Sequence, residues 1–221
     1  MFHGKQFDER LRRAAERAGV ETTPNQRALL GRFSDWIVSE GVDAGGIGPG
    51  ETERLVDRHV ADSLVFAAAW SDAPSALLDV GAGLGLPGIP LAITHTATRV
   101  TLLDRSGTRC RLARRALQVL DLENVIVRQA DIRTVTGVWD AVVFRASLPP
   151  KDALDVALPL LSENGCAVVG LSRSAEPPVF PSGPEGGKVD LLEIEAGVLD
   201  SPAWLLRMTP TDSPRQNGFA F

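Results

Sequence analysis

The stretch that most constrains the fold is an apolar run that ends in an acid and is followed at once by a glycine-rich turn, Leu77–Pro90. Such a run is typical of a buried parallel strand, and the turn after it is where a chain of this kind lies against a nucleotide-like ligand. Glycine suits the turn because it takes positive φ and because its missing Cβ lets a ligand approach the main chain. A second apolar run, Val100–Asp104, ends in a carboxylate about 20 residues further on, where such folds hold a ribose diol. The two runs together predict a cofactor site.

Short apolar runs alternate with helical segments through the chain after residue 70. The expected strands are Leu77–Val80, Val100–Leu103, Val125–Val127, Ala141–Phe144, Cys166–Leu171, Leu191–Glu195 and Trp204–Met208. The expected helices between them are Pro87–Thr94, Thr108–Leu120 and Lys151–Leu161. This alternation predicts right-handed crossovers and an α/β, Rossmann-like fold with a mostly parallel, seven-stranded sheet. The last two strands are expected to form an antiparallel pair at its edge.

The first 70 residues are expected to be helical because their apolar residues recur at helical spacing. Pro24 marks a helix start, and a further helix is expected over about residues 51–70. Glycine and proline predict loops over residues 41–50 and 174–188. We therefore expect an N-terminal helical extension (1–70), an α/β domain (71–209) and a weakly ordered tail (210–221).

Composition argues against several classes of protein. No apolar run approaches about 18 residues, so we expect no membrane span, and the first residues lack the apolar region of a secretory signal. Cys110 and Cys166 lack the spacing of metal ligands, so no metal site is predicted. We expect two buried, reduced thiols and a cytoplasmic protein.

The net charge of −5 argues weakly against a nucleic-acid partner, but the arginines are unevenly distributed. Five of them fall within eleven residues: Arg105, Arg109, Arg111, Arg114 and Arg115. On a helix, the last three lie largely opposite an apolar face. A solvated amphipathic helix and a surface that contacts RNA phosphates both explain this pattern.

Two cofactors fit the glycine-rich turn. Gly83, Gly85 and Gly88 match the dinucleotide pattern, which would make it a nicotinamide site. Three other features favour S-adenosylmethionine. Asp79 lies at the strand end, where Rossmann-like methyltransferases place an acid that contacts the cofactor's amino group through the loop. The glycines at 81, 83 and 85 alternate in the methyltransferase form, and Asp131 after the third strand is placed to accept from an adenine amino group.

The chain also resembles a known family. Arg58–Leu64 is similar to the Arg-His-x-x-Asp-Ser-Leu signature of the RsmG (GidB) family of bacterial 16S ribosomal RNA guanine-N7 methyltransferases. Asp79–Pro90 resembles that family's Asp-Val-Gly-x-Gly-x-Gly-x-Pro-Gly-Ile-Pro loop, and Phe144–Ala146 resembles its Ser-Arg-Ala motif. The resemblance implies a Rossmann-like S-adenosylmethionine-dependent methyltransferase fold over 71–209. It also implies a monomer that acts on 16S ribosomal RNA or the small ribosomal subunit.

One departure from the family falls after the fifth strand, where Leu-Lys-Gly is replaced by Leu171-Ser172-Arg173. Arg173 can supply the missing positive charge one position later. The lost lysine and the acidic net charge favour an alternative reading, a non-catalytic or altered-substrate relative that keeps the cofactor fold and binds RNA or a protein partner.

The fold and the resemblance together imply a set of site residues. Those expected to bind the cofactor are Asp79, Gly81, Gly83, Gly85, Leu86, Asp104, Ala130, Asp131 and Arg145. Those expected to bind substrate are Arg58, His59, Arg145 and Arg173. Arg145 is the expected catalytic residue, because a guanidinium at a strand end can hold guanine O6 or clamp a phosphate while leaving N7 free; a surface arginine that closes the strand is the other account.

No general base is needed, because N7 carries no proton. We therefore expect His59 to hydrogen-bond near the site or to contact phosphate. Arg58 and Asp62 are four positions apart, so an intrahelical ion pair accounts for both.

Overall fold

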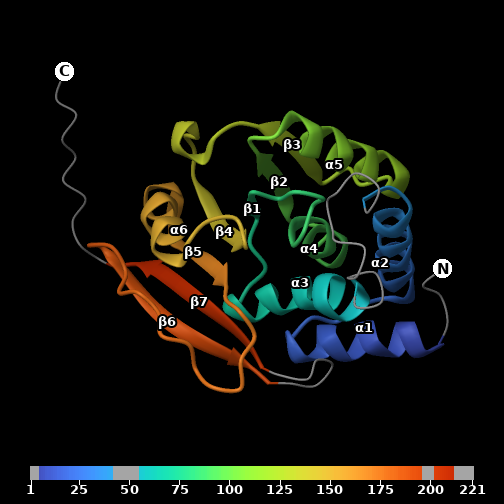
Figure 1. Ribbon diagram of the computed structural model, residues 1–221, viewed down its shortest axis with the longest axis horizontal. Helices are drawn as coiled ribbons and strands as arrows, with labels where there is room; N and C mark the ends of the chain where they lie inside the picture. The colour runs from blue at the N-terminus through green and yellow to red at the C-terminus, as the bar shows by residue number, and fades with distance from the viewer. Residues whose placement is uncertain (1–4, 42–54, 196–201, 212–221) are drawn as a thin grey trace.

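The computed structural model describes residues 5–41, 55–195 and 202–211 of the 221-residue chain. Its centre is a seven-stranded sheet in the order β3-β2-β1-β4-β5-β7-β6 (Figure 1). The strands are β1 (Ala76–Val80), β2 (Arg99–Asp104), β3 (Val125–Gln129), β4 (Trp139–Arg145), β5 (Leu161–Gly170), β6 (Gly187–Ile194) and β7 (Ala203–Pro210). Strands β1 to β5 are parallel, and β7 pairs antiparallel with β5 and β6. The predicted mostly parallel sheet with an antiparallel pair at its edge is confirmed.

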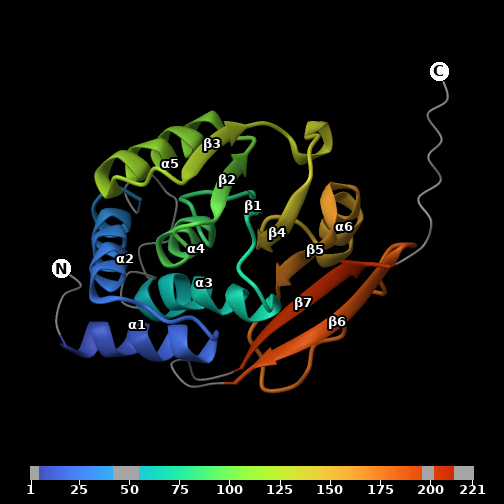
Figure 2. The ribbon, with the colours of Figure 1, turned by 180° about the vertical axis from the view of Figure 1, so that it is seen from behind.

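Helices cover both faces of this sheet. The α-helices are α1 (Lys5–Arg17), α2 (Pro24–Trp36), α3 (Asp62–Leu64), α4 (Gly88–Thr94), α5 (Gly107–Leu120) and α6 (Pro150–Ala157). The other helical turns are η1 (Ile37–Gly41), η3 (Val56–Ala61), η4 (Val65–Ala69), η5 (Ile132–Thr134) and η6 (Leu158–Leu160). Figure 2 shows α1, α2 and α3 gathered near α4, whereas α6 lies near β5.

Alternate residues of each strand point to opposite faces, and this divides the core in two. On one face, Leu77, Leu102 and Val143 belong to a buried cluster that also contains residues of α1 to α5. On the other face, Leu78 and Val142 belong to a cluster with α6 and η6. The helices before residue 70 therefore share a core with the sheet. The domain boundaries at 70 and 209 stay a prediction.

Three predicted boundaries are wrong by four residues or more, and one of them is the start of β6, which lies at Gly187 rather than Leu191 and so within the predicted loop 174–188. Helix α6 ends at Ala157 rather than Leu161, and β5 begins at Leu161 rather than Cys166. Pro159 lies between them and has no backbone N–H, so it cannot continue the α-helical ladder; a 3₁₀ turn forms instead.

The helix expected over residues 51–70 is irregular in its described part. A π-helical turn, η3, is followed by the short α3 and the 3₁₀ turn η4. The hydroxyl of Ser63 donates to the carbonyl of His59 at 2.5 Å and so competes with the regular ladder for that acceptor. Most of the predicted loop 41–50 and most of the tail lie outside the described residues.

No helix in the described part of the chain is long and apolar enough to cross a membrane. Both cysteines are buried and free.

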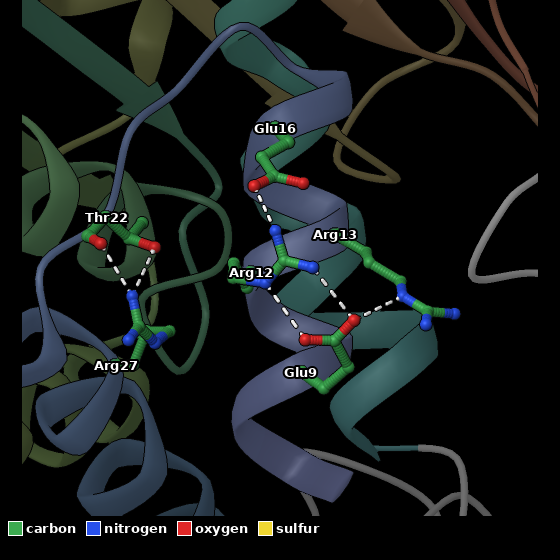
Figure 3. Close-up of polar contacts among 6 residues, drawn as sticks. All are labelled: Glu9, Arg12, Arg13, Glu16, Thr22 and Arg27. Atoms are coloured by element: carbon green, nitrogen blue, oxygen red, sulfur yellow. Dashed lines mark hydrogen bonds and ion pairs between the residues drawn. The ribbon is translucent and has the colours of Figure 1, made fainter. Parts of the chain in front are cut away.

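Charged residues on α1 form a network on its surface (Figure 3). Arg12 and Arg13 both donate to Glu9, and Arg12 also contacts Glu16. The hydrogen bonds from Arg12 and Arg13 lower the pKa of Glu9 to about 2. These side chains keep 40–59% of their surface exposed, so solvent screens the network and it adds little to stability.

Helix α2 is tied more firmly to its surroundings. Arg27 donates to the carbonyl oxygen of Thr22 at 2.6 Å (Figure 3) and to the carboxylate of Asp8 on α1 at 2.5 Å. At the start of α2, Thr23 and Gln26 form a capping box, which explains why Pro24 marks the helix start. The Gln26 amide nitrogen also donates to the carbonyls of Ile93 and Thr94 at 3.0 and 3.1 Å. One side chain thus completes the first turn of α2 and the last turn of α4.

We expect Gln26→Ala to lower the free energy of unfolding by about 1–3 kcal/mol, because it removes a cap and leaves two carbonyls of α4 without their donor. Urea unfolding followed by circular dichroism measures this. Gln118→Ala on the exposed face of α5 is the matched control and should change stability by less than about 0.5 kcal/mol. Equal effects of the two substitutions would contradict the bridging role of Gln26.

Candidate functional site

The glycine-rich loop between β1 and α4 is fastened to the end of β2. The N–H groups of Gly81 and Ala82 donate to the carbonyl of Leu103 at 2.7 and 3.0 Å. The N–H of Gly83 donates to the carboxylate of Asp104 at 3.1 Å. The two sequence features that predicted a cofactor site are therefore bonded to each other.

The loop glycines differ in what surrounds them. Gly81, Gly83 and Gly85 all have positive φ, of 70°, 59° and 94°. A Cβ at Gly81 would lie 2.4 Å from the Cβ of Ser147, and one at Gly85 would lie 2.4 Å from Ile89. Among the described residues, a Cβ at Gly83 would meet nothing closer than 3.9 Å. Packing of the protein itself thus requires Gly81 and Gly85, whereas Gly83 has open space where the sequence analysis expects a ligand.

Asp79 is a buried carboxylate with one unsatisfied oxygen. It is 1% exposed, and its Oδ2 accepts from the N–H of Gly88 at 2.8 Å. Its Oδ1 is buried and has no hydrogen-bond partner in the described structure. Burial raises the pKa of Asp79 to about 7, although Gly88 and the charge of Arg145 lower it. A cationic ligand group can satisfy this oxygen and favour the ionised form.

Asp104 is held by backbone groups on both oxygens. Oδ2 accepts from Gly83, and Oδ1 accepts from the N–H of Ser106 at 2.8 Å. The guanidinium of Arg109 lies 3.8 Å away. Each carboxylate oxygen has a second lone pair, so Asp104 can still accept from a ribose hydroxyl.

A cavity of about 580 Å³ opens beside this loop. The sequence-predicted residues that line it are Gly81, Asp104, Ala130 and Asp131. Asp131 caps η5, and its hydrogen bonds with Arg133 lower its pKa to about 2. Leu86 is only 8% exposed and packs in the apolar core, away from this lining.

A second cavity, of about 350 Å³, adjoins the first, because Ala146 and Leu148 line both. Its lining contains Arg145, Arg173 and Asp62. We call the first the loop cavity and the second the arginine cavity.

Arg145 ends β4 and lies in the wall of the arginine cavity. Its Nη2 is 3.0 Å from Nδ1 of His59. A guanidinium can only donate, so Nδ1 of His59 is the acceptor and the ring carries its proton on Nε2. Burial lowers the pKa of Arg145, and the charges of Asp62 and Asp79 raise it. The expected hydrogen-bonding role of His59 near the site is consistent with this contact.

The ion pair expected between Asp62 and Arg58 stays a prediction, because the Arg58 side chain lies outside the described residues. In the described structure, Oδ1 of Asp62 accepts from Nε and Nη2 of Arg173, with Nε at 3.1 Å. Arg173 follows β5 and lies 111 positions away. Spacing within one helix could not reveal this pair. Arg58 belongs to η3, but its side chain lies outside the described residues.

Three arginines of α5 contact groups of the protein itself. Arg111 donates to Thr108, Arg114 to the carbonyl of Val127 at 3.3 Å, and Arg115 pairs with Glu40 at 2.5 Å. These contacts fit the solvated amphipathic helix. A role in RNA contact stays a prediction.

Sequence reasoning missed three residues at this site. The hydroxyl of Ser147 is buried and has no hydrogen-bond partner among the described residues, and Ser147 lines the loop cavity. Phe66 and Trp204 line the arginine cavity. Ser147 follows the Phe-Arg-Ala motif directly, which is the one sequence signal that could have indicated it.

The residues present fit S-adenosylmethionine. The loop cavity has the size of a small-molecule site, and its neighbourhood holds two buried polar atoms that need partners, Oδ1 of Asp79 and Oγ of Ser147. A carboxylate suits a cationic cofactor group, and Asp104 and Asp131 offer acceptors for hydroxyl and amino groups.

Comparisons with known proteins agree with this fit. The family model GidB, rRNA small subunit methyltransferase G, matches residues 26–176. Ribosomal RNA small subunit methyltransferase G of Frankia alni is 33% identical over 206 residues, which cover 88% of this chain and 78% of that protein.

Two solved structures are similar in fold alone. TrmN from Thermus thermophilus has a TM-score of 0.51 at 19% identity, covering 67% of this chain and 49% of that one. Coclaurine N-methyltransferase bound to N-methylheliamine and SAH has a TM-score of 0.50 at 17% identity, covering 75% of this chain and 57% of that one. The prediction of a Rossmann-like methyltransferase fold is confirmed. The family match supports S-adenosylmethionine rather than a nicotinamide as the cofactor.

We expect Gly83→Val to abolish S-adenosylmethionine binding in calorimetry, because the branched side chain fills the open space beside the loop. Gly19→Val is the matched control: Gly19 also has positive φ, at 70°, and nothing lies within 4 Å of its Cβ position. Both variants carry backbone strain, but only Gly83→Val should lose the ligand. Binding by a folded Gly83→Val would show that the loop does not hold the cofactor.

We expect Asp79→Asn to remove a pH dependence of stability. In the unfolded chain the pKa of this carboxyl is near its ordinary 3.8, but in the folded protein it is about 7. The parent should therefore lose stability as pH rises from about 4 to 7, by at most about 4 kcal/mol, and no more above that. Relative to the parent, the Asn variant should become more stable as pH rises over this window. It should also bind S-adenosylmethionine more weakly.

Denaturant unfolding at pH 3, 6 and 8 measures the difference. Asp72→Asn, at an exposed carboxylate, should follow the parent. Parallel curves for Asp79→Asn and the parent would contradict the raised pKa.

Proposed function

The chain belongs to the GidB family, rRNA small subunit methyltransferase G, and we propose that it transfers a methyl group from S-adenosylmethionine to N7 of a guanine in 16S ribosomal RNA. The observation that carries this proposal is the pair of adjoining cavities. The carboxylates of Asp104 and Asp131 are among the groups that line the loop cavity, and Arg145 and Arg173 are among those that line the arginine cavity. A cofactor in the first and a base in the second would meet at the shared wall, Ala146 and Leu148.

The proposed reaction needs positioning rather than proton transfer. S-adenosylmethionine supplies an electrophilic methyl group on a sulfonium, and guanine N7 has a lone pair and no proton. The chain must align the two and exclude water. The Nδ1 lone pair of His59 is already engaged by Arg145, in keeping with a site that has no general base.

Arg145 has the central role in the proposal. It is partly buried at the end of β4, beside the shared wall, and the carboxylate of Asp79 on the cofactor side raises its pKa. From this position its guanidinium can donate to guanine O6 and leave N7 free. Asp79, Asp104 and Asp131 would hold the cofactor, and Arg58, His59 and Arg173 would contact the substrate.

The partner and the location follow from this substrate. We propose that the protein acts as a monomer on 16S ribosomal RNA or the small subunit in the cytoplasm. Mass spectrometry of the small-subunit RNA before and after incubation with the protein and S-adenosylmethionine tests the function. A new 7-methylguanosine supports it. Cofactor binding without methyl transfer to RNA or to small subunits would favour the non-catalytic reading.

We expect Arg145→Ala to slow methyl transfer by about 10- to 100-fold while S-adenosylmethionine affinity is retained, because a charge-assisted contact to the substrate is lost. Arg145 lowers the pKa of Asp79, so the comparison should be made well above pH 7, where Asp79 is ionised in both proteins. Arg145→Lys should restore little of the methyl-transfer rate, since the ammonium group of lysine lacks the planar, paired donors of a guanidinium.

Arg207→Ala is the matched control, because Arg207 is another partly buried arginine on a strand, paired with Asp190, but lines neither cavity. It should transfer methyl groups at the parent rate. Parent-like transfer by Arg145→Ala would remove Arg145 from the site.

A further inference from the structure

Asp62 lines the arginine cavity, and its two carboxylate oxygens differ in their hydrogen bonds. Both bonds from Arg173 go to Oδ1. No donor in the described part of the chain is bonded to Oδ2, and that atom is not among the buried polar atoms without partners. The side chain is 23% exposed, and that of Arg173 is 16% exposed. Arg173 therefore fixes a carboxylate whose other oxygen can accept from a ligand.

Arg145 directly precedes Ala146, which lies in the wall shared by the two cavities, whereas Asp62 lines the arginine cavity but not the loop cavity. Asp79 is beneath the cofactor loop, and Asp62 lines the arginine cavity. Arg145 is therefore the group beside the wall shared with the loop cavity, and Asp62 is a carboxylate of the arginine cavity alone. Moving away from the cofactor, a ligand in the arginine cavity meets first a donor and then an acceptor.

The edge of guanine has the complementary order. Next to N7 comes O6, an acceptor, and beyond it come N1–H and the 2-amino group, both donors. With N7 toward the cofactor and O6 on Arg145, the two donors point toward the next group in the cavity. Adenine would place a 6-amino donor against Arg145 and the N1 lone pair against a carboxylate, so both contacts would be repulsive.

We propose that Asp62 is the residue that selects guanine, by accepting hydrogen bonds from N1–H and the 2-amino group, and that Arg173 is its positioning residue. This inference rests on the proposed function and assigns the base specificity of the same site. Phe66 and Trp204 add apolar and aromatic surface to the lining, which suits a planar base.

Inosine tests this assignment, because it differs from guanosine only in lacking the 2-amino group. The guanosine methylated by the parent is first located by mass spectrometry. Small subunits are then assembled from ligated 16S ribosomal RNA that carries guanosine or inosine at that position. The ratio of kcat/KM for the two substrates is measured for each variant, and calorimetry with S-adenosylmethionine checks that each variant is folded.

The parent should prefer guanosine by about 10- to 100-fold, the usual cost of leaving a charged acceptor without its donor. In Asp62→Ala the ratio should fall to about one. Asp62→Asn, which keeps the shape, should also give a ratio of one or less, since its amide can turn a donor toward the 2-amino group. Arg173→Gln should reduce the ratio, and Arg173→Lys should restore part of it.

Asp190→Asn is the matched control, because Asp190 on β6 is also paired with an arginine, Arg207, and lines neither cavity. It should keep the parent ratio. The role of Asp62 would be overturned if the parent methylated guanosine and inosine subunits equally well, or if both Asp62 variants kept the parent's ratio of kcat/KM. Either result would leave the proposed function intact. A parent that transfers no methyl group to the guanosine subunits overturns both.

Discussion

The bonds between the glycine-rich loop and the end of β2 are the constraint on which the site depends. Three successive N–H groups, those of Gly81, Ala82 and Gly83, are satisfied by the last two residues of the neighbouring strand. A loop that must satisfy its backbone in this way cannot move without losing those bonds. The loop cavity therefore has a fixed wall.

The same constraint places charge in the interior. Asp79 ends up beneath the loop with one oxygen on Gly88 and the other unsatisfied. Without a ligand, a buried carboxylate of this kind lowers the stability of the folded protein, and its raised pKa reflects this destabilisation. Replacement by an apolar residue would remove that cost, so its presence is better explained by a ligand than by stability. Arg145 and Asp104 act on it with opposite signs, so the ionisation of the site is a property of the group rather than of one residue.

The sheet and the glycine-rich loop could be predicted from local sequence, because each depends on a short pattern of residues. An apolar run followed by alternating glycines predicts a strand and its turn, and Thr23-Pro24 predicts the start of α2. The pair Asp62–Arg173 could not be predicted in this way, since its partners are far apart and belong to segments without regular periodicity. The π-helical η3 likewise has no period that a search for 3.6-residue repeats would detect. The roles of the glycines were only half predicted, because the atoms that crowd Gly81 and Gly85 come from Ser147 and Ile89.

What brings Asp62 and Arg173 together is a glycine that the sequence analysis did not single out. Gly170 ends β5 and is paired in register with Arg145 at the end of β4. A Cβ at Gly170 would lie 2.8 Å from the ring of Phe66, so the absence of a side chain there lets η4 pack against the strand end. Asp62 lies just before η4, and Arg173 lies just after β5. Because η4 packs closely against the end of β5, Asp62 and Arg173 both lie in the lining of the arginine cavity, together with Arg145 at the end of β4. The arginine cavity is in this sense a consequence of packing at Gly170, as the loop cavity is a consequence of hydrogen bonding at Asp104.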